Sequence, residues 1–167
     1  MIKKILIGIV FFLIGVGIAI FVSSFFRKLI QDLFQWTTSN GIHFGGKDFY
    51  LFGSPVHFVS FGLALFIFSI ANRKAGFQKI VRNTFVLVLL FAIALVVICA
   101  LDAHLKIVGC TACKEGSMRL GYGEISYGFI LATSAILAVI PSGVALFKTI
   151  KKLTNSSIHD ISIQKNI

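Results

Sequence analysis

The sequence has few charged residues and very few acidic ones. Charged residues make up 13% of the 167 positions, and six acidic residues stand against 16 basic ones. Soluble domains contain about 25% charged residues, so a chain that is 57% hydrophobic needs a solvent that accepts apolar surface. That solvent is lipid. The sequence therefore predicts an integral membrane protein rather than a soluble globular domain.

The chain also lacks the motifs of most enzyme and transport chemistry. It contains no P-loop pattern, no H-E-x-x-H, no G-x-S-x-G and no C-x-x-C-H. Its long apolar runs carry no Asp, Glu, Lys or Arg, whereas ion-coupled transporters use charged side chains within their membrane helices. Only two prolines and no low-complexity tract are present, so nothing indicates a long linker.

Four apolar runs predict an all-α fold, an antiparallel bundle of four transmembrane helices. The expected helices cover residues 5–26, 55–71, 84–101 and 125–147 of a single domain, 1–152, which a polar cytoplasmic tail follows over 153–167. At 1.5 Å per residue, the longest of these runs cross the roughly 30 Å hydrocarbon core of a bilayer. Because the second connection is short, sequential helices are expected to contact each other.

Two details concern the first helix and the loop after it. Gly15, Gly17, Ser23 and Ser24 are small enough to let a neighbouring helix approach closely, although glycine is simply common in membrane helices. In the loop, Ile42–Phe44 and Asp48–Phe52 flank a Gly-Gly-Lys sequence, which favours a short β-hairpin.

The distribution of basic residues predicts the orientation. With both termini in the cytoplasm, the inner segments hold ten basic residues and one acid, whereas the outer loops hold six basic residues and five acids. The positive-inside rule then places residues 27–53 and 101–124 outside, as in a bacterial inner membrane protein. Membrane topology accounts for the net charge of +10, so we expect the lipid bilayer as a partner and no nucleic acid.

Cys110 and Cys113 form a C-x-x-C motif in the second outer loop. In an oxidising compartment this pair favours a structural disulfide that braces the loop. A redox-active pair that exchanges electrons with a soluble protein or a quinone is an alternative, and inert reduced thiols are another. Cys99, inside the third apolar run, is expected to be a small buried residue rather than a partner.

A metal site is a further alternative for the same motif. Asp102 and His104 precede Cys110 and Cys113, which gives a D-x-H-x5-C-x2-C set that would suit a transition metal such as zinc or copper. His57 stands near the outer end of the second run and is a weaker candidate. An interfacial hydrogen-bonding role is the preferred interpretation of His57.

Four helices with a cysteine pair in the second outer loop resemble the disulfide-bond-forming quinone reductases of bacterial inner membranes. The vitamin K epoxide reductase family is similar in placing a C-x-x-C close to the outer end of a late helix. These resemblances imply a quinone cofactor and catalysis by Cys110 and Cys113. The chain departs from the first family because residues 27–53 contain no cysteine to relay electrons, and we assign no family.

The leading functional hypothesis is a small non-enzymatic accessory or envelope factor. Its outer loop, braced by a disulfide, would contact another membrane or extracytoplasmic protein, and no cofactor is expected. The second hypothesis is a thiol–disulfide oxidoreductase that uses Cys110 and Cys113, and the third is a metal-handling protein that uses His104 with the cysteines. The first is favoured mainly because residues of catalysis and transport are scarce.

Overall fold

The computed structural model describes residues 2–44, 55–110, 118–120 and 124–164. The elements are α1 (Ile2–Thr37), β1 (Ile42–Phe44), α2 (Val56–Asn72), α3 (Phe77–Val108), β2 (Met118–Leu120) and α4 (Tyr127–Gln164). By length and composition, three helices (α1, α3 and α4) can cross a membrane, and α2 is a shorter apolar helix. The prediction of a helical membrane protein with four apolar helices is confirmed at this level.

The helices extend beyond the apolar runs that predicted them. The last helix continues to Gln164, so most of the segment expected as a polar tail is helical. The third helix has 32 residues, about 48 Å at 1.5 Å per residue, which exceeds the roughly 30 Å hydrocarbon core. Apolar composition marks the part of a helix that suits lipid. Gln, Lys and Arg are good helix formers, so the polar residues at the start of α3 lengthen that helix.

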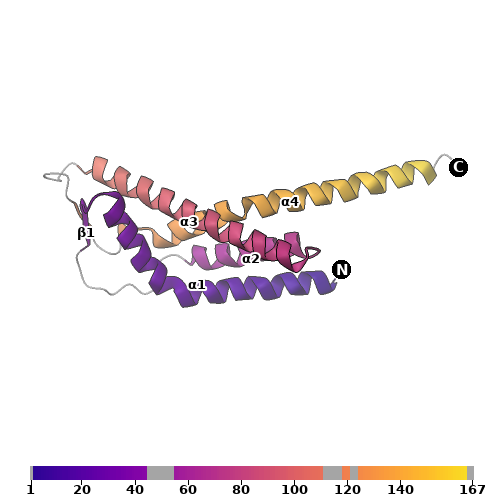
Figure 1. Ribbon diagram of the computed structural model, residues 1–167, viewed down its shortest axis with the longest axis horizontal. Coiled ribbons are helices and arrows are strands. Elements are labelled where there is room, and N and C mark those ends of the chain that lie inside the picture. Colours follow the sequence, from indigo (N-terminus) through magenta and orange to yellow (C-terminus); the bar gives the residue numbers. More distant parts are fainter. Residues whose placement is uncertain (1, 45–54, 111–117, 121–123, 165–167) are drawn as a thin grey trace.

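The four helices pack as a ring in which each has two main neighbours. α1 packs along α2, α2 along α4 and α4 along α3, with a smaller contact between α3 and α1. The expected contact between sequential helices also holds for α2 and α3, whose rings Phe61 and Phe91 lie with their centroids 5.5 Å apart, although these two helices are not a main packing pair. Figure 1 shows that α1 begins and α4 ends at the end of the bundle opposite β1, and that α4 projects beyond the other helices.

α1 and α2 form the most extensive contact between helices because they approach each other closely. A Cβ atom added to Gly15 would lie 2.6 Å from the carbonyl oxygen of Phe61, and one added to Gly62 would lie 2.6 Å from Cε2 of Phe12. Gly15 is thus needed where the two helices touch, because its Cβ would meet backbone, whereas a Cβ on Gly62 would require the Phe12 ring to shift. The expectation of close packing is confirmed for Gly15, whereas a Cβ on Gly17 would meet nothing within 4 Å.

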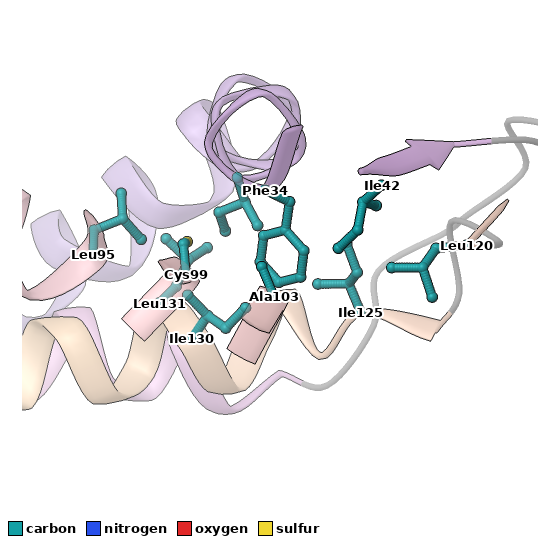
Figure 2. Packing of buried hydrophobic residues seen from close by; sticks show 10 residues of the cluster. Phe34, Ile42, Leu95, Cys99, Ala103, Leu120, Ile125, Ile130 and Leu131 are labelled. Atoms are coloured by element: carbon teal, nitrogen blue, oxygen red, sulfur yellow. The ribbon is translucent and has the colours of Figure 1, made fainter. Parts of the chain in front are cut away.

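The larger buried cluster lies at the strand end of the bundle, as Figure 2 shows. Its buried members are Ile30, Phe34, Ile42, Leu95, Cys99, Ala103, Leu120, Ile125, Ile130 and Leu131. They come from α1, α3, α4, both strands and Ile125, which lies two residues before α4. A smaller cluster, Ala64, Phe68, Ala135 and Val139, lies between α2 and α4. Elsewhere the large apolar side chains of the helices are widely exposed, as a lipid-facing surface requires.

The two strands join segments that are far apart in the sequence. β1 pairs with β2 in parallel, with Ile42 opposite Met118 and Phe44 opposite Leu120. The strand expected at Ile42–Phe44 is therefore present, but its described partner comes from the second loop. The expected second half of the hairpin, residues 48–52, lies outside the described residues.

A turn at the end of α1 aims the chain into β1. The N–H of Asn40 donates to the carbonyl of Gln35 at 2.8 Å, and the N–H of Ser39 donates to that of Trp36 at 3.3 Å. This pair of bonds is the Schellman pattern. Ser39 and Asn40 have φ values of 50° and 63°, in the left-handed region that glycine usually occupies.

Candidate functional site

The strand end of the molecule gathers most of the residues that the sequence singled out. We call it the cap and define it as β1, β2 and the helix ends beneath them, residues 30–37, 99–110 and 124–131. Ile42 and Leu120 are the most buried strand side chains, and both point into the cluster that contains Phe34 (Figure 2). His43 and Arg119 stand between the inward-pointing residues and are exposed, as alternation along a strand requires.

Polar contacts hold the elements of the cap together. The side-chain amide of Gln31 donates to the hydroxyl of Tyr127 at 2.8 Å, which links α1 to α4. Lys106 Nζ on α3 donates to the carbonyl oxygen of Glu124 at 3.2 Å, just before α4. These two bonds therefore join the ends of α1, α3 and α4 within the cap.

Cys110 is the second residue after α3. Gly109 is the C-cap of that helix, and the N–H of Cys110 donates to the carbonyl of Ile107 at 3.2 Å. Cys110 is half-buried and is not a free thiol. Cys113 lies outside the described residues, so a bond between the two stays a prediction. Cys99 is a free thiol, fully buried in the cap cluster, in the small buried role expected of it.

The predicted metal ligands do not converge within the described residues. Asp102 is half-buried and His104 is exposed, although only one residue separates them. Two positions apart on a helix means about 200° of rotation, so these side chains lie on nearly opposite sides of α3. The described part of the chain brings together no group of three His, Cys, Asp or Glu side chains that could hold an ion. The complete four-residue set includes Cys113 and is not tested.

His57 occupies the first turn of α2 and is buried. Its ring lies against that of Phe58, with the centroids 3.9 Å apart and the planes tilted by 42°. The interfacial hydrogen bond expected of His57 stays a prediction.

A cleft beside the cap was not predicted from the sequence. It has a volume of about 390 Å³ and is lined by Asp32, Gln35, Trp36, Ser39 and Asn40. All five come from the last turns of α1 and the Schellman turn. The signal available in the sequence was the change from an apolar run to polar residues after Phe26, which marks a helix leaving lipid.

A further feature of the cap is an apolar stripe on α3. Leu101, Leu105 and Val108 are 60%, 70% and 84% exposed, and their i, i+4, i+7 spacing puts them on one face. We call these three residues the α3 stripe. Asp102, His104 and Lys106 interleave with it in the sequence and mark the level at which α3 becomes polar. Leu105 and Val108 therefore lie beyond the uninterrupted apolar part of the helix.

These features define a mostly helical protein with three helices long and apolar enough to cross a membrane, in which β1 and β2 pair at one end of the helices. No protein-family model matches the chain, and comparisons with curated proteins and with solved structures found no match.

Proposed function

We propose that this chain is a non-enzymatic accessory or envelope factor of a bacterial inner membrane, and that its cap binds another membrane or extracytoplasmic protein. The observation that carries the proposal is the α3 stripe. Large apolar side chains that stand clear of the apolar part of a helix need either lipid or a protein partner to cover them. Ala103 and Ile107, on the same stretch of α3, pack into the buried cluster of the cap, which holds the stripe in place and lowers the entropy cost of binding.

The orientation in this proposal has both termini in the cytoplasm. Its support is the excess of basic residues in the segments at the end opposite the cap, including the connection between α2 and α3. The cap then faces the oxidising side, where a disulfide is stable.

We further propose that Cys110 and Cys113 form a structural disulfide. Cys110 is not a free thiol, and Cys99 is free and buried elsewhere in the cap. The position of Cys110 also favours a staple over a redox centre. A reactive thiolate is stabilised at a helix N-terminus, whereas Cys110 follows a C-terminus, whose partial negative charge opposes a thiolate.

Membrane orientation is tested by accessibility labelling. Single cysteines replace His43 on β1 and Lys79 on α3, both exposed, in a chain without its native cysteines. A membrane-impermeant maleimide added to intact spheroplasts should label position 43, and position 79 only after permeabilisation. Labelling in the opposite order would overturn the orientation.

The environment of the α3 stripe is tested with a spin label at position 105. Contact with a water-soluble nickel chelate should exceed contact with oxygen, because the residue lies outside the hydrocarbon. A label that reports lipid would mean that the stripe is membrane surface, which would sink the partner-binding proposal.

Partner binding is tested by photo-crosslinking from position 43 in intact membranes. One discrete cross-linked species is expected, and it should disappear in Leu105→Ser/Val108→Ser. The matched control, Leu6→Ser/Val10→Ser, removes exposed apolar side chains of α1 far from the cap and should leave the species unchanged. Equal loss in both variants would show that the stripe has no special role.

Thiol trapping distinguishes the structural disulfide from the oxidoreductase alternative. A structural disulfide should remain oxidised in membranes and have a reduction potential below about −300 mV. A mixed thiol population, or trapping of a mixed disulfide by Cys113→Ser, would favour the enzyme instead.

A further inference from the structure

The connection between α2 and α3 presents a dense basic surface at the end opposite the cap. Its four cations, Arg73, Lys74, Lys79 and Arg82, are all exposed. The sequence contains no acidic residue between Asp48 and Asp102, so nothing in this stretch offsets their charge. We call residues 73–82 the basic corner.

The start of α3 separates apolar from polar side chains. At 100° per residue, Phe77, Ile80 and Val81 fall on one face of the helix, whereas Lys79, Arg82 and Asn83 fall on the other. Phe77 is 81% exposed and Val81 is 52% exposed. The basic corner therefore combines a charged surface with apolar side chains that no part of the described chain covers.

Hydrogen bonds hold the basic corner in place. The side-chain amide of Asn83 on α3 donates to Oδ1 of Asn72, which is buried at the end of α2. Asn72 in turn donates to the carbonyl of Phe68 at 2.9 Å, and the N–H of Ala75 donates to the carbonyl of Asn72 at 2.8 Å. Because the turn is fixed at both helices, the cations are presented from an ordered base.

We propose that the basic corner binds the phosphate headgroup of an anionic phospholipid, of the phosphatidylglycerol class. Lysine and arginine clusters next to a membrane helix attract anionic headgroups. The apolar face of Phe77, Ile80 and Val81 would enter the acyl region while the long cationic side chains reach up to the phosphate. This proposal requires only that the chain is embedded in a bilayer, and it is independent of any partner at the cap.

A lipid fits this surface better than an acidic soluble protein does. Each cation is a few residues from an exposed apolar side chain, and α3 continues directly into an apolar run from Thr84. A surface that is both basic and apolar at the boundary of a membrane helix matches the layered chemistry of a phospholipid. A soluble acidic protein would complement the positive charge, but it would leave the apolar face of Phe77, Ile80 and Val81 uncovered.

The experiment is native mass spectrometry of the full chain in detergent, titrated with phosphatidylglycerol. Phosphatidylcholine is the neutral comparison and glycerol 3-phosphate is the free headgroup. We expect phosphatidylglycerol to bind more tightly than phosphatidylcholine, and glycerol 3-phosphate to leave the bound lipid in place. In Arg73→Gln/Lys74→Gln, affinity should fall by about fivefold for each cation removed.

The matched control is Lys28→Gln/Arg119→Gln, which removes two exposed cations at the cap end. Phosphatidylglycerol affinity should be unchanged in this variant. An equal loss in both variants would show attraction by net charge alone and would overturn the site, as would equal binding of both lipids by the wild-type chain. Displacement of the lipid by glycerol 3-phosphate would identify a soluble phosphate compound as the occupant and would equally overturn the proposal.

A measurement on the unmodified chain keeps the proposal testable if the double variant does not fold. Raising the salt concentration should weaken phosphatidylglycerol binding and leave phosphatidylcholine binding unchanged, because exposed charges are screened. Salt-independent binding of phosphatidylglycerol would contradict an electrostatic headgroup site.

Discussion

The side-chain amide nitrogen of Gln31 on α1 donates a hydrogen bond of 2.8 Å to the hydroxyl oxygen of Tyr127, the first residue of α4. These two helices are not a main packing pair, so the bond joins opposite sides of the helical ring. It is part-buried, and losing the hydroxyl leaves the amide without this acceptor. The link is therefore a specific polar contribution to the stability of the cap.

Removing that hydroxyl should destabilise the protein modestly. Tyr127→Phe is expected to lower the free energy of unfolding by about 1 kcal/mol, the usual net value of such a bond. Unfolding in mixed micelles measures the change. A double-mutant cycle with Gln31→Leu isolates the pair, and a coupling energy near zero would show that the bond contributes nothing.

The contact between α1 and α2 should not tolerate a methyl group at Gly15. Gly15→Ala would place its Cβ against the backbone of Phe61, and backbone has little room to yield. We expect a loss of about 1–3 kcal/mol in unfolding free energy, seen as a lower Tm. Gly17→Ala is the control on the same helix, where the space is open, and it should be neutral or slightly stabilising. Similar effects at both positions would contradict the close helix contact.

The turn at the end of α1 offers a stabilising substitution. Ser39 has a φ of 50°, which costs a side-chain-bearing residue about 1 kcal/mol, so Ser39→Gly should raise the free energy of unfolding by about 0.5–1 kcal/mol. The same substitution at Ser24, exposed within α1, should have the opposite sign, because glycine is a poor helix former. Destabilisation by Ser39→Gly would show that the turn is not left-handed there.

Alternation along β1 predicts a sharp difference between neighbours. Ile42 is fully buried beneath the strand pair, so Ile42→Ala should cost about 2 kcal/mol or more through lost burial and the cavity left behind. His43→Ala, one residue later and exposed, should change the unfolding free energy by less than about 0.5 kcal/mol. Thermal unfolding of both variants in the same detergent makes the comparison. A larger effect at His43 would mean that the register of β1 is shifted by one.

Much of the fold could be predicted because lipid imposes simple rules. Uninterrupted apolar runs locate the four helices, since a backbone in hydrocarbon must satisfy its own hydrogen bonds. Ile42–Phe44 was recognisable as a strand from its local sequence. Gly15 was recognisable as a possible contact, but its sequence could not distinguish it from Gly17, because the difference depends on which face α2 covers.

The remaining features depend on contacts between distant segments. The pairing of Ile42 with Met118 and the bond between Gln31 and Tyr127 leave no local pattern. The ends of the helices could not be predicted either, because hydropathy indicates where a segment suits lipid and not where the backbone stops being helical. For the candidate site, the sequence was enough to single out Cys110 and the basic residues by residue type. The α3 stripe could be recognised only from the exposed fractions of its three side chains.

The parallel pairing of β1 with β2 has a consequence for the order of events during synthesis. One strand follows the first helix to emerge, and the other follows the third. The sheet cannot close until the chain has been synthesised through α3 and β2, and its core is completed only when Ile130 and Leu131 of α4 arrive. Closure of the cap is therefore a late step of synthesis. A chain stalled after two helices would display an unpaired strand edge, which can pair with another chain.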